Sequence, residues 1–102
     1  MLKYKKKDII VKASQKNNIS QYDMKLAFDS VIETMRNMLT EEQSNIRIEI
    51  RNFGIFEVKK TKAKPRARNP KTNEEIYVPP HRKIHFKPGK VIDKELKKEW
   101  LE

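Results

Sequence analysis

Apolar residues recur with helical spacing in two stretches of the first 40 residues. Residues 7–16 place their isoleucines and Ala13 on one side, which predicts an amphipathic helix. A second helix is predicted to begin at Ser20, because Asp23 follows three residues later in a variant of the capping box. Its apolar stripe comprises Met24, Ala27, Phe28, Val31, Ile32, Met35, Met38 and Leu39. We interpret this methionine-rich stripe as protein core or as a dimer seam.

Strict alternation of apolar and polar residues replaces the helical spacing after the polar segment 40–45. Residues 46–50 alternate isoleucine with charged residues, which predicts a half-buried strand. A tight turn is predicted at residues 52–54, and Phe56 and Val58 continue the alternation in a second strand.

The segment from residue 59 to residue 75 cannot bury itself, because its only apolar side chains are two alanines and two prolines. Apolar residues return at 76–78 and again at Ile84 and Phe86. We therefore predict that the second and third strands form a long hairpin whose far half leaves the body of the protein.

A closing helix is predicted at residues 90–100, where Ile92, Leu96 and Trp100 share one face. The elements together indicate an α+β fold in one domain of 102 residues. A chain of this length buries only about two thirds of its unfolded surface, so a partner subunit would add stability. The sequence has no cysteine and no apolar run typical of a signal peptide or a membrane span, so we expect a cytoplasmic protein without membrane contact.

The net charge of +10 is concentrated in one part of the chain. Residues 59–90 contain 11 Lys and Arg against 2 Asp and Glu, a net charge of +9. The segments before and after it are close to neutral, with 10 basic against 8 acidic residues and 3 against 4. Such a concentration indicates a polyanion-binding surface, and nucleic acid is the commonest partner of that kind. The alternative is an interaction domain that binds acidic proteins through its basic face.

Three segments resemble the signature of HU and IHF, the bacterial DNA-bending proteins. They are RNFGIFEV at residues 51–58, ARNPKT at residues 67–72 and HRKIHFKPGK at residues 81–90. The order of two helices, three strands and a short helix also fits this family across nearly the whole chain. The sequence departs from the usual pattern at Asn52, Thr61, Lys64 and Asn73. Asparagine tolerates left-handed turn conformations, so Asn52 and Asn73 can stand where glycine is usual.

The resemblance implies a homodimer, or a heterodimer with a paralogue, in which the helices of both subunits intertwine. Residues 1–45 would form the helical dimerisation base, and residues 90–102 the short C-terminal helix. Residues 46–89 would form a three-stranded antiparallel sheet with a long β-hairpin arm at about 59–76. The implied function is largely sequence-tolerant binding and bending of double-stranded DNA by minor-groove arms, with compaction of the bacterial nucleoid. A site-specific, IHF-like DNA bender is the alternative, because both branches of the family share the motif at the arm tip.

The same resemblance implies roles for individual residues. Pro70 would enter between base steps as an apolar wedge, a mechanism already known for IHF and HU. Without the resemblance, Asn69-Pro70 would indicate only a turn. Arg66, Arg68 and Asn69 would enter the minor groove, where the negative potential attracts arginine. The residues expected to contact phosphates are Lys59, Lys60, Lys62, Lys64, Lys71, Arg82, Lys83, Lys87 and Lys90.

Other kinds of site have little support in the sequence. Phe53, Phe56 and Phe86 could stack on single-stranded bases, but we assign them to the core. His81 and His85 have no cysteine and no nearby carboxylate, which makes a poor metal site. No serine lies in a nucleophile elbow, so we expect neither catalysis nor a cofactor.

Overall fold

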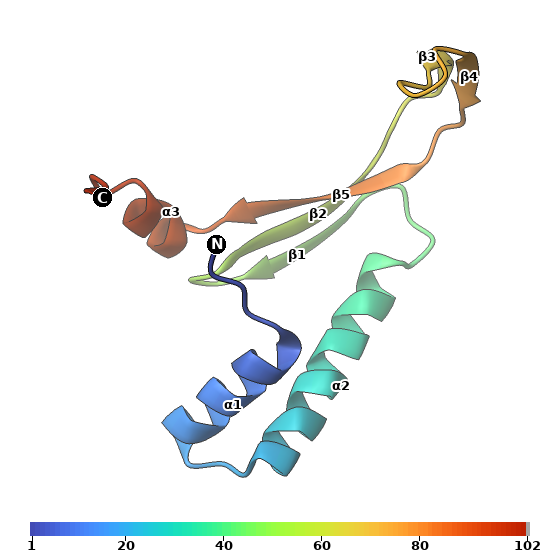
Figure 1. The fold of residues 1–102 in the computed structure, drawn as a ribbon. Coiled ribbons are helices and arrows are strands. Elements are labelled where there is room, and N and C mark those ends of the chain that lie inside the picture. Colours follow the sequence, from blue (N-terminus) through green and yellow to red (C-terminus); the bar gives the residue numbers. More distant parts are fainter. Residues whose placement is uncertain (102) are drawn as a thin grey trace. The chain divides into compact units, whose positions relative to one another are not determined.

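The computed structural model describes residues 1–101, without the side chains of Lys64, Pro65 and Ala67. The chain forms two compact units, Met1–Thr40 and the remainder from Glu41 onward. Figure 1 shows that the first unit consists of two helices, and that the second holds the β-strands and a short helix. This content confirms the α+β class.

The helix α1 spans Lys6–Asn17. At its start, the backbone N–H of Lys5 donates a hydrogen bond to the Asp8 carboxylate at 2.8 Å. Asp8 also lies in the first turn, where the helix dipole favours negative charge. The helix ends at Asn18, whose φ of 52° is left-handed, a conformation that asparagine accepts more readily than most residues.

The helix α2 spans Gln21–Leu39 and begins as predicted. The Ser20 hydroxyl accepts a hydrogen bond from the backbone N–H of Asp23 at 3.0 Å, which satisfies one of the free donors at the helix start. An ion pair joins α2 to α1 through Asp29, which contacts Lys6. The hydrogen bond from Lys6 lowers the pKa of Asp29, and burial opposes this shift only in part.

The apolar stripe of α2 is covered only in part within its own unit. No residue of α2 is buried, and Val31 in the middle of the stripe is 57% exposed. On α1 only Ile10 and Ser14 are buried. An apolar stripe left partly open on a helix of five turns is typical of an interface with another chain. The structure therefore favours a dimer seam over a core for this stripe.

Three strands form the first sheet of the second unit, in the order β1-β2-β5. They are β1 (Ile46–Ile50), β2 (Gly54–Lys60) and β5 (Arg82–Pro88), and both pairings are antiparallel. The turn between β1 and β2 contains Asn52 with a φ of 65°, which confirms that this asparagine takes a left-handed conformation. This register divides the side chains of the sheet between two faces.

One face of the sheet is apolar. Phe56 is paired with Ile48 on one side and Phe86 on the other, and the rings of Phe56 and Phe86 lie 4.9 Å apart. Phe53 in the turn adds a third ring, 5.5 Å from Phe86. Val58 on the same face is buried. The three phenylalanines therefore form one apolar cluster as predicted, although Phe53 and Phe86 stay partly exposed in a single subunit.

Two further strands form the arm, β3 (Lys64–Arg68) and β4 (Glu75–Val78), which pair antiparallel in a sheet of their own. The pairing shifts between Lys64 and Ala67, so β3 contains a bulge. Proline 65 lies within it and has no N–H to donate to a ladder, which suits such an irregular position. The long hairpin with an exposed far half is thereby confirmed (Figure 1).

The returning strand is not continuous from 76 to 86. β4 ends at Val78 and β5 begins at Arg82, because Pro79 and Pro80 cannot donate ladder hydrogen bonds. At this break the backbone N–H of Thr61 donates to the His81 carbonyl at 2.7 Å, and the Thr61 hydroxyl also accepts from the His81 N–H at 3.2 Å. These bonds join the two sides of the arm at its root.

The C-terminal helix α3 is shorter than predicted. It spans Lys90–Leu96, so the expected end at Trp100 was wrong. Trp100 is exposed and Leu96 is exposed as well, so no burial stabilises a further turn. A short helix without an apolar contact at its end is not expected to extend on propensity alone.

Candidate nucleic-acid interface

The tip of the arm is a loop that holds Pro70 at the surface. The backbone N–H of Asn69 donates to the Glu74 carbonyl at 2.9 Å, and the N–H of Asn73 donates back to the Asn69 carbonyl at 2.7 Å. The side-chain oxygen of Asn69 accepts from the Lys71 N–H at 2.9 Å. These bonds close the loop on both sides of Pro70 and leave its ring exposed. The loop therefore presents the proline ring to solvent.

Asn73 fixes the tip in two ways. Its φ of 59° is left-handed, as expected for an asparagine in a position usual for glycine. Its side-chain oxygen accepts a hydrogen bond from the Arg68 guanidinium at 3.1 Å. Arg66 and Arg68 are both exposed beside the loop. Two residues that we expected only to permit the turn or to contact DNA therefore also organise the loop that carries Pro70.

The structure describes the side chains of some, but not all, of the lysines predicted to contact phosphates. Lys62 and Lys71 are exposed, and neither has an ion pair among the described residues. The side chain of Lys64, which we expected to contact a phosphate, lies outside the described part of the chain. Lys90 is the first residue of α3 and is exposed.

The second face of the three-stranded sheet, here termed the charged face, is polar throughout except for Ile55. Its charged and titratable residues are Arg47, Glu49, Glu57, Lys59, Lys83, His85 and Lys87. Lys59 is paired with Lys83 across β2 and β5, and Lys87 lies on the same face four residues further along β5, beyond His85. Three of the predicted phosphate-binding residues are therefore brought together by the register, on the side away from the phenylalanines.

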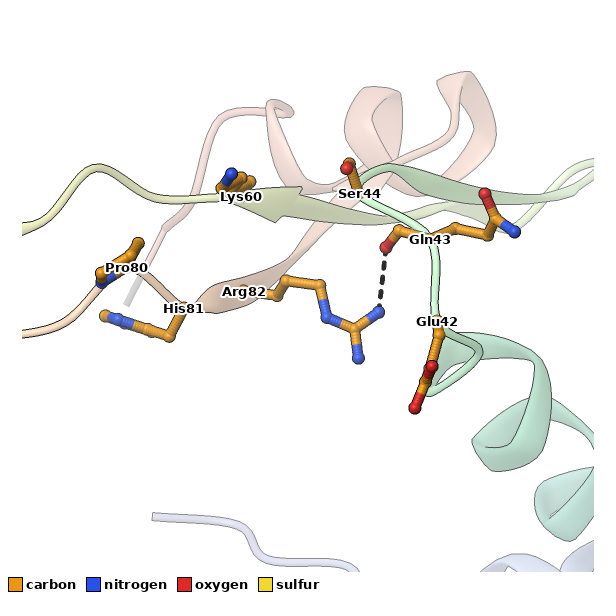
Figure 2. A pocket seen from close by; sticks show the side chains of 7 residues that line it. All are labelled: Glu42, Gln43, Ser44, Lys60, Pro80, His81 and Arg82. Atoms are coloured by element: carbon orange, nitrogen blue, oxygen red, sulfur yellow. Dashed lines mark hydrogen bonds between the residues drawn. The ribbon is translucent and has the colours of Figure 1, made fainter.

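Lys60 and Arg82 lie apart from that group. They are paired with each other but have the opposite strand parity, so they belong to the other side of the sheet. Arg82 donates hydrogen bonds from one guanidinium nitrogen to the backbone carbonyls of Glu41 and Gln43 at 2.5 and 3.0 Å. Figure 2 shows this guanidinium reaching the segment before β1. Sequence reasoning placed Arg82 in the same basic group as Lys83, whereas the structure gives it a role in holding this segment.

A shallow pocket surrounds Arg82 in this unit. Its lining residues are Glu42, Gln43, Ser44, Lys60, Pro80, His81 and Arg82 (Figure 2). No group of three or more His, Cys, Asp and Glu side chains suited to a metal ion occurs among the described residues. None of the described helices is long and apolar enough to cross a membrane.

Sequence reasoning missed Glu57, the carboxylate at the middle of the charged face. Its side chain is only 11% exposed, and Lys59 contacts it at 3.2 Å. The hydrogen bond from Lys59 lowers the pKa of Glu57, and burial opposes this shift. The turn predicted at residues 52–54 could have indicated this contact from the sequence. Two strands that pair symmetrically about that turn place Glu57 opposite Arg47.

Comparison with known proteins agrees with this arrangement. Residues 4–97 match the model of the family described as bacterial DNA-binding protein. DNA-binding protein HU of Thermotoga maritima is 33% identical over 92 residues, which are 90% of this chain and 98% of that protein. The beta subunit of integration host factor from Marinobacter nauticus is 41% identical over 80 residues, which are 78% of each chain.

A solved structure has the same fold. The chain in an Anabaena HU–DNA cocrystal structure superimposes with a TM-score of 0.80 at 24% identity, covering 94% of this chain and all of that one. The fold and the site together define an architectural DNA-binding protein. The chain belongs to the family of bacterial DNA-binding proteins that includes HU and IHF. Proteins of this family bind DNA as dimers, which accounts for the uncovered stripe of α2.

Proposed function

We propose that this protein bends double-stranded DNA with little sequence preference, by laying its two arms in the minor groove and inserting Pro70 between base pairs. The observation that supports this proposal is the loop at the arm tip, where hydrogen bonds on both sides of Pro70 leave its ring exposed. Proline is a suitable wedge because it is apolar, its φ is restricted, and it loses little side-chain entropy on insertion.

Minor-groove contacts would come from Arg66, Arg68 and Asn69. The Asn69 oxygen already accepts the Lys71 N–H, so its NH₂ group is the part left to meet DNA. An amide donor suits the minor groove of A·T pairs, where adenine N3 and thymine O2 are both acceptors. Since these acceptors look alike in A·T and T·A pairs, such a contact adds little sequence selectivity, in agreement with the proposed tolerance.

Phosphate contacts would supply most of the affinity. The group formed by Lys59, Lys83 and Lys87 is favoured for this role, since these lysines share one face of the sheet. Lys62, Lys64, Lys71 and Lys90 are proposed for phosphates along the arm and at the start of α3. Lys60 and Arg82 are also proposed to contact phosphates. Arg82 would do so through the guanidinium N–H groups that do not bond to the carbonyls of Glu41 and Gln43.

The binding mechanism predicts a strong salt dependence. If the dimer neutralises about 6 to 10 phosphates, its affinity for duplex DNA should fall roughly 10³- to 10⁵-fold between about 50 and 200 mM salt. The test is a titration of a fluorescent duplex of about 35 base pairs over that salt range, with end-to-end energy transfer to report bending. A flat salt response, or binding without a rise in energy transfer, would contradict the proposal. Absence of duplex binding at low salt would favour an acidic protein as the partner.

We further propose that DNA bending by this protein compacts the nucleoid in the bacterial cytoplasm. Many bends at sites of any sequence shorten DNA, and the concentrated positive charge of the arm and sheet permits such general binding. Cell imaging of the labelled protein against a DNA stain tests this part. A diffuse signal excluded from the DNA would contradict it.

Site-specific bending is the second candidate function, and the 41% identity to an integration host factor beta subunit supports it. In that case sequence preference would arise from the deformability of the DNA and not from base contacts. Selection from a pool of random duplexes separates the two candidates. An enriched motif supports the site-specific function, and a pool that stays random supports the sequence-tolerant one.

A further inference from the structure

Glu57 lies beneath three cations that come from three different positions of the sheet. Its carboxylate is 3.2 Å from Lys59 on the same strand, 3.8 Å from Lys87 on β5 and 4.0 Å from Arg47 on β1. Glu49 also contacts Arg47, at 2.9 Å. Among the described residues, Glu57 is therefore the one anion that both lysines at the centre of the charged face contact.

The exposures of the partners differ sharply. The Glu57 side chain is 11% exposed, whereas the side chains of Lys59 and Lys87 are 59% and 68% exposed. The lysines thus contact the carboxylate while more than half of each lysine side chain stays open to solvent. A polyanion that approaches this face meets these ammonium groups before it meets the carboxylate.

We propose that Glu57 is an internal competitor for DNA phosphates, which holds Lys59 and Lys87 in the free protein and gives them up to the duplex on binding. This inference rests on the proposed function, because it assigns a regulating residue to the same DNA-binding surface. The proposal concerns how strongly the lysines of the charged face bind DNA phosphates, and not where the arm inserts.

The exchange is energetically accessible because the ammonium groups belong to side chains that are more than half exposed, and an ion pair whose cation is well solvated is weak. The lowered pKa of Glu57 keeps its carboxylate ionised near neutral pH, so its charge cannot be removed by taking up a proton. When its lysines turn to phosphates, the carboxylate must instead attract a cation from solution. That uptake offsets part of the counterion release that drives DNA binding. Glu57 should therefore lower both the affinity and its salt dependence.

The test compares Glu57→Gln with Glu49→Gln in equilibrium binding of a fluorescent duplex over a range of salt. Both substitutions remove one negative charge from the same face, but in the described part of the chain Glu49 forms an ion pair with Arg47 alone. For Glu57→Gln we expect about 1.5- to 5-fold tighter binding, the range typical of surface ion pairs, because both lysines are more than half exposed although Glu57 is not. The plot of log affinity against log salt should steepen by up to about one per subunit. Equal effects of the two substitutions would mean that net charge alone matters, which would overturn the proposal.

A second comparison leaves Glu57 in place and applies even if its substitution prevents folding. Lys59 and Lys83 are cross-strand partners on the charged face, and Lys83 has no ion pair among the described residues. Because Lys59 must first leave Glu57, Lys59→Met should weaken DNA binding less than Lys83→Met does. Losses of the same size, or a larger loss for Lys59→Met, would count against competition by Glu57.

A third comparison, made in a variant that lacks both lysines, tests whether the effect of Glu57 on affinity acts through Lys59 and Lys87. The gain from Glu57→Gln should disappear when Lys59→Met and Lys87→Met are also present, and an undiminished gain would contradict the proposal. The parent protein serves as the separate control for the underlying function. If the parent does not bind the duplex, the proposed function fails; if it binds and Glu57→Gln behaves as Glu49→Gln does, only the role of Glu57 fails.

Discussion

Replacement of Pro70 by alanine should reduce DNA bending while leaving the salt dependence of binding unchanged. The loop should keep its form, because the bonds that close it belong to Asn69, Lys71, Asn73 and Glu74, and none involves Pro70. No charge changes, so the number of phosphates neutralised should stay the same. The substitution therefore separates the wedge from the electrostatic contribution.

The magnitude follows from the apolar surface of the exposed ring. The proline ring has two more side-chain carbons than alanine, and each buried carbon of the methylene type contributes about 0.8 kcal/mol. Insertion should therefore lose about 1.6 kcal/mol per arm, or about 3 kcal/mol for the two arms of a dimer. A loss of 1.6 kcal/mol corresponds to roughly a 15-fold change in an equilibrium constant. Unstacking a base step itself costs a few kcal/mol, so this loss is large enough to shift most complexes towards straighter DNA.

The assay is energy transfer between dyes on the two ends of a duplex of about 35 base pairs, measured at saturating protein. Pro80→Ala is the matched control, because it makes the same chemical change at an exposed proline away from the tip. We expect reduced transfer for Pro70→Ala and transfer near the parent value for Pro80→Ala. If Pro70→Ala bends the duplex as far as the parent does, with the same affinity, the wedge role is wrong.

Three further substitutions test the fold that supports the site. Arg82→Met should lower stability in urea by roughly 1 to 3 kcal/mol, because two backbone carbonyls lose a charged donor; an unchanged midpoint would contradict this role. Gly54→Ala should destabilise by about 1 to 3 kcal/mol, since its Cβ would lie 2.6 Å from the Phe86 ring, and a thermal melt equal to the parent's would refute the crowding. Asp29 has a pKa below the usual 3.8, so its contribution to stability is complete above that value and is lost as pH falls through the lowered folded pKa. Asp29→Asn should therefore reduce the acid sensitivity of helix content measured by circular dichroism below about pH 4, and an identical pH profile would exclude the contact with Lys6 as its cause.

Local patterns were sufficient for most of the secondary structure. The Ser20 cap, the alternation at residues 46–50 and the left-handed asparagines depend on neighbours within a few residues, and all three were confirmed. The C-terminal helix was predicted with the correct start at Lys90, but its predicted end was wrong, because its length depends on whether Trp100 finds a surface to pack on. Spacing on one face indicates where a contact could form, but a helix continues only if the contact exists.

Some features of the DNA-binding site could likewise be predicted from the sequence, and others could not. The arm, its concentrated charge and the exposed Pro70 are properties of a local segment, so they could be recognised from the sequence. The bonds from Asn69 and Asn73 around Pro70 and the contacts of Glu57 with cations of three strands depend on atoms placed in space.

The sequence by itself determined the elements, the basic arm and the position of the proline at its tip, because these follow from spacing and residue type within short segments. Only the tertiary structure decided which basic residues act together. Strand register placed Lys59, Lys83 and Lys87 on the face that carries Glu57, with Lys59 and Lys87 in contact with it, and turned Lys60 and Arg82 to the other face. The physical reason is that successive side chains of a strand point to opposite faces, so the register decides which residues share a face. Hydrogen bonds to distant carbonyls then hold some of these side chains, as they hold Arg82.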